Sequence, residues 1–414
     1  MTPFDYNSIP AVLVLSEEPF GLDNGFGVTL HNLFAGWPDE KLYVFYAHQH
    51  SKSDHNSGRR TPQIHCPVNA HHGRRYALPM LLGIKPQWRE HYSRLWLNLH
   101  LKRFKPDVIY ILLHSESTLL FGEWIAKSLK IPFVVHVADA PTFRNSKTPH
   151  ILRSAAVRYA ISEPMAREYR SRYDASFNIL RNPASIDYYR DVANPRPMRS
   201  PRDRRLTIRY LGRLHSWLHY ESLRLLGQAV NECDQAGVAW TVELYGSADE
   251  ADLRKAEVLN SQVVYCGTVS RETGIKILQE ADLLVLPLTY QPETIAAYKY
   301  SFPTKLAEYL ATGVPILVLA DEAAASVSFC QEHSVAHCIT SPDVHLIKQF
   351  LSSFWSEPHR IIEEAKRNPS VCKSHFGYES TTLMFQNSLC AAASSHSVLG
   401  LNNQYKPTSH SLPL

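Results

Sequence analysis

The sequence is poor in cysteine, and its cysteines are not grouped. Only seven occur among 414 residues, an odd number, and none forms a C-x-x-C pair. Neither a disulfide framework nor a zinc site of paired cysteines is therefore expected. Scattered thiols are typical of a reducing cytoplasm. We expect a cytoplasmic protein without a metal site.

Long apolar runs are also missing. No run reaches the roughly 18 residues that a membrane-spanning helix needs. The first apolar run, AVLVLS at 11–16, follows no basic segment and directly precedes Glu17 and Glu18. This pattern favours a core strand over a secretory signal. With 44% hydrophobic and 20% charged residues, the chain is typical of a globular protein with room for two domains.

The dinucleotide-binding pattern G-x-G-x-x-G is absent after the first run. The segment there reads DNGFGVTL, with Gly25 and Gly27 followed by Leu30, which weighs against a nicotinamide-dependent dehydrogenase. We expect the two glycines to lie in a turn that lets the backbone approach a ligand, with a helix from Val28 to Phe34. A helix start there would favour an anion. The alternative is a tight turn alone.

Short apolar runs are the main feature that the chain does have. They are continuous in Val, Ile and Leu, which predicts parallel strands covered on both faces. Helix-like segments lie between them, as expected for βαβ units. The predicted strands are 11–16, 41–47, 107–113, 132–139, 156–162, 177–180, 206–212, 239–246, 263–267, 281–288, 315–320 and 335–340.

A proline- and arginine-rich segment, 191–205, separates the two sets of strands. It predicts a linker between two Rossmann-like, doubly wound α/β domains, at 1–190 and 206–375, that face each other across a cleft. A C-terminal helix at 376–390 could cross back, and the polar tail 391–414 is expected to be disordered. Ligands of such sheets bind at the carboxyl ends of the strands.

Two loops at strand ends carry candidate ligand groups. Gly212 and Arg213 follow the strand 206–212, where the forked guanidinium would suit a diphosphate. The alternative is a surface arginine paired with Glu221. In SFPTKLAEYLATGVPILV, 301–318, Pro303 predicts a helix start and Gly313 its end.

Lys305 falls in the first turn of that helix, and Glu308 lies on the same face. A cation for phosphate oxygens and a carboxylate for ribose hydroxyls together predict a nucleotide diphosphate site. The alternative is a simple Lys–Glu pair. His136, near the end of the fourth strand, is either a core histidine or a ligand group.

With these pieces in order, the chain resembles the family-4 glycosyltransferases of the GT-B architecture over about residues 10–385. The resemblance rests on DNGFG, AISEPMAREYRSRYDASFNILRNPASID, RYLGRL, VELYG, VVYCGTVSRETGIKILQEADLLVLPL and the segment 301–318. It implies retaining transfer of a sugar from a nucleotide diphosphate sugar to an acceptor hydroxyl. The second domain would bind the donor and the first the acceptor, without a further cofactor.

The resemblance also implies roles for single residues. Arg213 would stabilise the leaving diphosphate, Glu308 would contact the ribose, and His136 would lie beside the transferred sugar. Gly25 and Gly27 would face the diphosphate.

Two positions depart from the family pattern. Tyr300 stands where the first glutamate of the E-x7-E motif is expected, and the lysine that follows the arginine is missing, with Leu218 and His219 near its place. Lys305, after Thr304, would supply the missing charge. Tyr300, Thr304 and Gly212 complete the predicted donor site.

Two other functions are open from the sequence, a GT-B nucleotide-sugar epimerase and a non-catalytic nucleotide-sugar or carbohydrate binder.

Between 51 and 105 there are eleven Lys or Arg against two Asp or Glu. This zone could dock the enzyme on an anionic membrane carrying a lipid-linked acceptor, or it is a solvated helix face. Nucleic acid is not expected, because no binding motif accompanies the charge.

Overall fold

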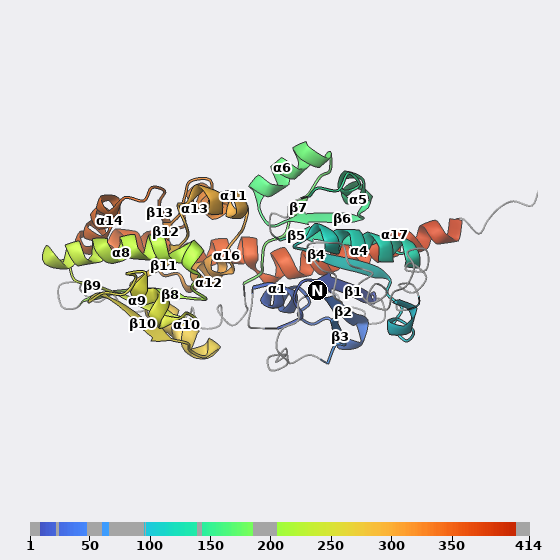
Figure 1. Cartoon of the computed structure of the whole chain (residues 1–414), viewed down its shortest axis with the longest axis horizontal. Coiled ribbons are helices and arrows are strands. Elements are labelled where there is room, and N and C mark those ends of the chain that lie inside the picture. The colour runs from blue at the N-terminus through green and yellow to red at the C-terminus, as the bar shows by residue number, and fades with distance from the viewer. Residues whose placement is uncertain are drawn as a thin grey trace, which may run out of the picture. The chain divides into compact units, whose positions relative to one another are not determined.

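The chain forms two compact units. A computed structural model describes residues 9–21, 25–47, 60–65, 95, 97–138, 143–184 and 205–402. The first unit combines Met1–Leu180 with Thr382–Leu414, and the second is Arg181–Thr381 (Figure 1). Of the predicted linker 191–205, only Arg205 lies among the described residues.

A parallel sheet of seven strands forms the centre of the first unit. Their order is β3-β2-β1-β4-β5-β6-β7. In the middle, Val14 pairs with Val44 on one side and Tyr110 on the other. The strands are β1 (Val12–Ser16), β2 (Leu42–Tyr46), β3 (Gln63–His65), β4 (Val108–Leu113), β5 (Phe133–Val137), β6 (Val157–Ala160) and β7 (Asn178–Ile179). All six predicted strands of this half are confirmed, and β3 is an addition.

The helices of the first unit connect these strands. Ser115 caps the N-terminus of α4 by accepting from the backbone N–H of Thr118, and Lys130 ends that helix with a left-handed φ of 54°. The helical elements are α1 (Gly25–Leu33), the 3₁₀ turn η2 (Asp39–Lys41), α4 (Glu116–Leu129), α5 (Thr148–Ser154), α6 (Glu163–Tyr173) and α17 (Met384–Asn402).

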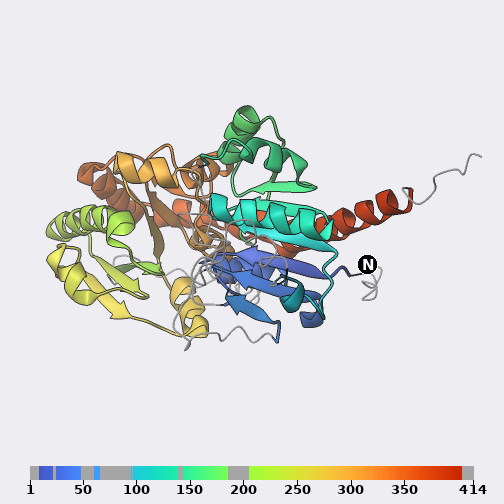
Figure 2. The ribbon, with the colours of Figure 1, turned by 45° about the vertical axis from the view of Figure 1, so that its right-hand side comes forward.

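Helix α17 belongs to the first unit. The predicted C-terminal helix was placed at 376–390, whereas α17 begins at Met384. Phe385 packs on Phe34 and Tyr110, with ring centroids 5.2 and 4.9 Å apart. Gln386 donates to the carbonyls of Leu33 and Ala35. Figures 1 and 2 show this helix running along the sheet of the first unit. It continues to residue 402, so the prediction of a disordered tail from 391 is wrong for 391–402.

The second unit is built around a six-stranded parallel sheet in the order β10-β9-β8-β11-β12-β13. The chain order reverses between β8 and β11, which makes their carboxyl ends the switch point where ligands bind in such folds. The strands are β8 (Leu206–Leu211), β9 (Trp240–Tyr245), β10 (Val263–Gly267), β11 (Leu283–Pro287), β12 (Ile316–Leu319) and β13 (His337–Ile339). Each corresponds to a predicted strand.

Helices cover both faces of this sheet. Tyr210 joins the core cluster that includes Leu223 of α8 and Phe350 of α14, whereas the next residue, Leu211, contacts Gly274 of α10. Neighbouring strand residues point to opposite faces, so α8 and α10 lie on opposite faces. The helices are α8 (Ser216–Gln235), α9 (Glu250–Lys255), α10 (Arg271–Gln279), α11 (Pro292–Tyr298), α12 (Thr304–Thr312), α13 (Ala325–His333), α14 (Val344–Ser356), α15 (Pro358–Ala365) and α16 (Asn368–Phe376), followed by the π-helical turn η4 (Tyr378–Leu383).

Within the described ranges, no helix combines the length and the apolar character needed to cross a bilayer.

Candidate active site in the second unit

Gly212 and Gly246 lie against each other at the switch point. Gly212, directly after β8, donates its N–H to the carbonyl of Tyr245 at 2.9 Å. Gly246, after β9, has a φ of +125°, and a Cβ on it would lie 1.9 Å from the Gly212 carbonyl oxygen. The two backbones therefore touch, and Gly246 has no room for a side chain, whereas a Cβ on Gly212 would meet the ends of the Tyr210 and Lys305 side chains. Close packing of the two loops therefore accounts for Gly246.

The side chain of Lys305 lies beside Gly212. A Cβ on Gly212 would be 3.1 Å from the Lys305 Cε, and its ammonium bonds the Glu308 carboxylate at 2.8 Å. Because an ammonium has three N–H donors, this pair leaves capacity for a ligand oxygen. The predicted Lys–Glu pair exists, but it lies at the switch point and not on an unrelated helix surface.

Helix α12 has the predicted boundaries. It starts at Thr304 after Pro303 and ends at Gly313, whose φ is +69°. No side chain caps its N-terminus, so the positive end of the helix dipole meets the same space as the Lys305 side chain. Thr304 is half-buried.

Arg213 is exposed at the carboxyl end of β8, and its Nε donates to the Ser247 hydroxyl at 3.4 Å. It does not pair with Glu221. That carboxylate accepts from the Tyr290 backbone N–H at 3.1 Å and from the Gln291 amide at 2.6 Å. Among the described residues, no carboxylate forms an ion pair with this guanidinium, so its charge is available to a ligand.

A buried polar network, not predicted from the sequence, holds the Arg213 loop. The Tyr210 hydroxyl donates to the Arg213 carbonyl at 2.9 Å and lies 3.5 Å from His219 Nε2. His219 Nδ1 lies 2.9 Å from the His215 backbone nitrogen and 3.3 Å from the His215 carbonyl oxygen. Burial, then His215, lowers the pKa of His219 to about 4, which keeps the ring neutral.

The charges of Arg213 and Glu308 also act on this network. Burial, then Arg213, lowers the pKa of His215, and burial, then Glu308, raises the pKa of Tyr210. Arg213 and Glu308 therefore border the same network. Its sequence signal was three polar aromatic side chains around a strand end, in YLGRLHSWLH.

Tyr300, at the expected first-glutamate position, is buried, 8% exposed. The Lys299 ammonium lies 4.5 Å from the centroid of its ring. The tyrosine hydroxyl can donate or accept a hydrogen bond but lacks the charge of a carboxylate, so the donor contact of Tyr300 stays a prediction.

His136 is a core histidine. Its side chain has no exposed surface, and both ring nitrogens have partners. The Tyr110 hydroxyl lies 2.7 Å from Nδ1, and the Leu180 carbonyl 3.1 Å from Nε2. Burial lowers its pKa to about 4. The predicted contact with a transferred sugar is therefore not supported, and the structural alternative is the one observed.

The glycines after β1 also differ from expectation. Helix α1 begins at Gly25, so Gly25 and Gly27 lie in its first turn and not in a preceding loop. A Cβ on Gly27 would lie 2.8 Å from the Gly21 carbonyl oxygen. Close packing of α1 on the chain after β1 therefore accounts for this glycine within the first unit.

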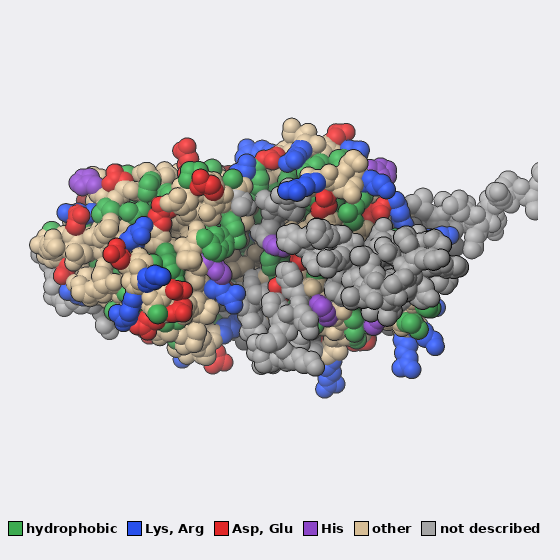
Figure 3. All heavy atoms as spheres, in the orientation of Figure 1, with side chains coloured by type: hydrophobic (Ala, Val, Ile, Leu, Met, Phe, Trp, Pro, Cys, Tyr) green, Lys and Arg blue, Asp and Glu red, His purple; other side chains and the backbone are tan. Residues whose placement is uncertain are grey.

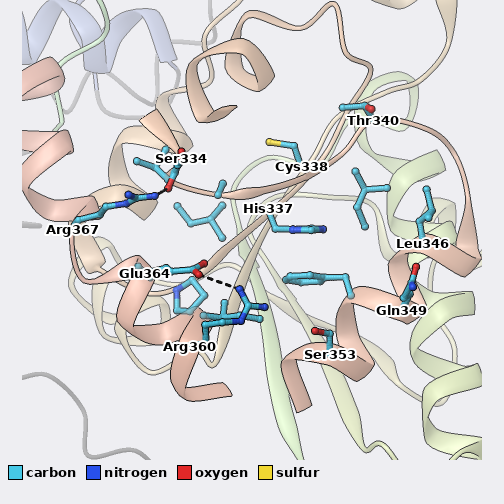
Figure 4. Close-up of a pocket in the computed structure, with 18 of the residues that line it drawn as sticks. Ser334, His337, Cys338, Thr340, Leu346, Gln349, Ser353, Arg360, Glu364 and Arg367 are labelled. Carbon is cyan, nitrogen blue, oxygen red and sulfur yellow. Dashed lines mark hydrogen bonds and ion pairs between the residues drawn. The ribbon is translucent and has the colours of Figure 1, made fainter. Parts of the chain in front are cut away.

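A separate groove of about 870 Å³ follows the edge strand β13. Figure 4 shows His337 and Cys338 of β13 beside it, with Arg360 and Glu364 of α15 joined by an ion pair. The His337 ring stacks on Phe350 at 4.1 Å. None of the predicted site residues lines this groove.

Most of the basic zone 51–105 lies outside the described residues, which there include only 60–65, 95 and 97–105. Its membrane role therefore remains a prediction. On the face that Figure 3 shows, the coloured acidic and basic side chains of the second unit are intermixed.

One family model matches part of the chain. Residues 205–344, which contain the β8 and β11 loops and α12, match the family model "Glycosyl transferases group 1". A search of curated proteins finds no match.

Solved structures match over nearly the whole chain. Anabaena HepE, crystallised with UDP and glucose, has a TM-score of 0.63 at 14% identity, covering 93% of this chain and 100% of that one. A Rickettsia africae glycosyltransferase has a TM-score of 0.65 at 10% identity, covering 94% and 99%. The Burkholderia multivorans trehalose 6-phosphate synthase has a TM-score of 0.57 at 9% identity, covering 97% and 100%. The chain therefore has the GT-B fold, and its second unit carries a glycosyltransferase group 1 domain.

Proposed function

We propose that this protein is a retaining glycosyltransferase of the family-4 type, which moves a sugar from a nucleotide diphosphate sugar to an acceptor hydroxyl. One observation carries the proposal. At the switch point of the second unit, the Lys305 stem lies on Gly212. Next to Gly212 in the chain is Arg213, which is exposed and has no carboxylate partner among the described residues. Two cations thus come from loops at the strand ends where a diphosphate would bind.

The site chemistry supports a nucleotide as the occupant. Lys305 and the uncapped start of α12 favour an anion, and the Arg213 guanidinium can hold two oxygens at once. Glu308, whose side chain is 13% exposed, supplies a carboxylate that can accept from ribose hydroxyls. HepE, which shares the fold, was crystallised with UDP and with UDP-glucose, so uridine nucleotides are the first ligands to test.

The reaction needs little covalent help from the protein. The bond between the anomeric carbon and the diphosphate oxygen breaks, and its electron pair leaves with the nucleoside diphosphate. The acceptor oxygen bonds the anomeric carbon on the same face, and its proton passes to the departing diphosphate oxygen. Arg213 and Lys305 stabilise the charge that grows on the departing oxygens, and losing one such donor typically costs about 2.7–4 kcal/mol.

The acceptor in this proposal is a saccharide or a lipid-linked saccharide, as in polysaccharide or glycolipid synthesis. Docking of the zone 51–105 on an anionic membrane belongs to the same proposal.

Turnover of a nucleotide sugar tests the proposal. A panel of UDP-, GDP- and ADP-sugars is incubated with and without saccharide acceptors, and release of nucleoside diphosphate is measured. We expect acceptor-dependent release that Arg213→Ala lowers at least about a hundredfold. Arg224→Ala serves as the control, since Arg224 is an exposed arginine of α8 away from the strand end. Equal losses in both variants would refute the role of Arg213.

One observation favours a second candidate, a non-catalytic nucleotide-sugar binder. Tyr300 is buried at the first-glutamate position, and no carboxylate replaces it there. Binding of a nucleotide sugar without any release of nucleoside diphosphate would support this binder. Release that does not depend on an acceptor would instead support an epimerase or a hydrolase.

A further inference from the structure

An exposed tryptophan lies in the first turn of α8, directly after the Arg213 loop. Trp217 is 45% exposed, although large aromatic side chains contribute most when they are buried. Two other rings contact its ring. His215 stacks on it with centroids 5.4 Å apart and an interplanar angle of 28°, and Tyr298 of α11 lies 4.8 Å away.

The rings continue from Trp217 into the core. His215 stacks on His219 at 5.9 Å, and His219 lies 5.7 Å from Tyr210. The exposed indole is therefore anchored through His215 to the same network that fixes the Arg213 carbonyl. A solvent-facing ring that is held in place in this way is a preformed surface for a flat or apolar ligand.

Trp217 and Tyr298, called the aromatic platform below, come from the two segments that carry the cations. Trp217 follows Arg213 by four residues, and Tyr298 ends the helix that leads to Lys305. Trp217 belongs to α8, whereas the Tyr309 hydroxyl of α12 bonds the backbone N–H of Leu211, whose side chain contacts α10. Helix α12 also contacts α10, so the helices that carry Glu308 and Trp217 lie on opposite faces of the sheet, and Gly212 and Arg213 follow the strand between those faces.

This order gives the bound nucleotide a direction. A nucleotide with its ribose at Glu308 and its diphosphate at Lys305 and Arg213 would have its base toward α10. The sugar end then points toward α8, which is where an acceptor has to meet it.

We propose that Trp217 and Tyr298, with His215 behind them, bind a pyranose ring of the acceptor saccharide; this inference rests on the proposed function. A pyranose has a face made of C–H groups, which packs on an aromatic ring while its hydroxyls stay at the rim in water. An exposed, rigid indole with an imidazole beside it suits this amphipathic shape. A nucleobase is disfavoured because the ribose position directs it to the other face.

Binding of simple pyranosides tests this platform without knowledge of the natural acceptor. Methyl glycosides of glucose, galactose, mannose and N-acetylglucosamine are screened by saturation-transfer NMR against the whole chain, alone and with UDP present. Titrations then compare the unmodified protein with Trp217→Ala, Trp217→Phe and Leu346→Ala. Leu346 is a control because it is 41% exposed in the same unit but lines the β13 groove.

We expect at least one pyranoside to bind with UDP present, Trp217→Ala to weaken it about tenfold, and Trp217→Phe and Leu346→Ala to weaken it less than threefold. UDP binding should be unchanged in all three variants. Pyranoside binding that Trp217→Ala leaves intact would overturn the platform. Weaker UDP binding in that variant, or displacement of the pyranoside by a nucleotide sugar but not by UDP, would assign the ring to the donor and also overturn it.

The two proposals fail in different ways. If the nucleotides and nucleotide sugars do not bind but a pyranoside binds through Trp217, the platform stands and the transferase assignment falls. If nucleotide sugars are turned over and no pyranoside binding depends on Trp217, the platform falls alone. Matching unfolding midpoints of the variants show that neither result comes from misfolding.

Discussion

The Lys305 side chain occupies the space that Gly212 leaves open, with its Cε 3.1 Å from the position that a Cβ on the glycine would take. The same Cβ would lie 2.8 Å from the Tyr210 hydroxyl. One missing side chain thus sets the place of the lysine and of the hydroxyl that holds the Arg213 carbonyl.

Gly212→Ala should therefore weaken nucleotide binding more than it weakens the fold. The added methyl displaces the flexible lysine stem, so we expect UDP affinity to fall about tenfold and the free energy of unfolding to fall by about 1–2 kcal/mol. Calorimetry and chemical denaturation measure the two. Gly21→Ala, where no atom lies within 4 Å of the added Cβ, is the control. Unchanged UDP affinity in Gly212→Ala would contradict the prediction.

Gly246→Ala should be far more damaging to stability. Its Cβ would lie 1.9 Å from the Gly212 carbonyl oxygen, and its φ is +125°, so backbone must move. We expect a loss of about 3 kcal/mol or more in the free energy of unfolding. Gly267→Ala is the matched control, since it has a φ of +76° but no atom within 4 Å; it should cost about 1–2 kcal/mol. Similar losses at both sites would show that the contact with Gly212 is unimportant.

Substitutions of Lys305 and Glu308 should have different effects when the ligand is shortened from UDP to pyrophosphate. Lys305→Ala removes a cation for phosphate, so it should weaken UDP and inorganic pyrophosphate alike, by about tenfold or more. Glu308→Gln removes the ribose acceptor, so it should weaken UDP but not pyrophosphate. Calorimetric titrations with both ligands test this. If Glu308→Gln weakened pyrophosphate as much as UDP, the carboxylate would act only by holding Lys305.

Acid should destabilise both units through buried histidines. The pKa values of His136 and His219 fall from about 6.5 unfolded to about 4 folded. Between these values the unfolded chain binds more protons, so stability falls as pH drops from 6.5 to 4, by up to about 3 kcal/mol per histidine. Denaturation across this range should show a shallower pH dependence for His136→Gln and His219→Gln. The control, His345→Gln at an exposed position, should keep the full slope, and equal slopes in all variants would contradict the account.

The strands could be predicted because their sequence pattern has a single cause. Parallel strands covered by helices on both faces need continuous apolar runs, and all twelve predicted runs form strands. Strand β3 was not predicted, because Gln63–His65 is short and half-buried at the sheet edge. Helix α12 was also predictable, since Pro303 and Gly313 mark its ends by backbone chemistry alone.

The roles of single polar residues could not be predicted as well. His136 sits in an apolar run whether it serves the core or a ligand, and only its contacts with Tyr110 and Leu180 decide. The link between Tyr210 and His219 depends on how α8 packs against β8, which no local pattern encodes. The contact of Gly246 with Gly212 joins two strand ends distant in sequence, and became visible only in the fold.

Nucleoside diphosphate binding in a double-mutant cycle tests the central claim most directly. UDP, GDP and ADP are titrated by calorimetry into the unmodified protein, Arg213→Ala, Lys305→Ala and the double variant, with Arg224→Ala and Lys276→Ala as exposed controls from α8 and α10. We predict that one nucleotide binds, that each site variant weakens it at least about tenfold, and that the controls do not. If a nucleoside diphosphate binds equally well to the double variant, the diphosphate site between Arg213 and Lys305 is contradicted.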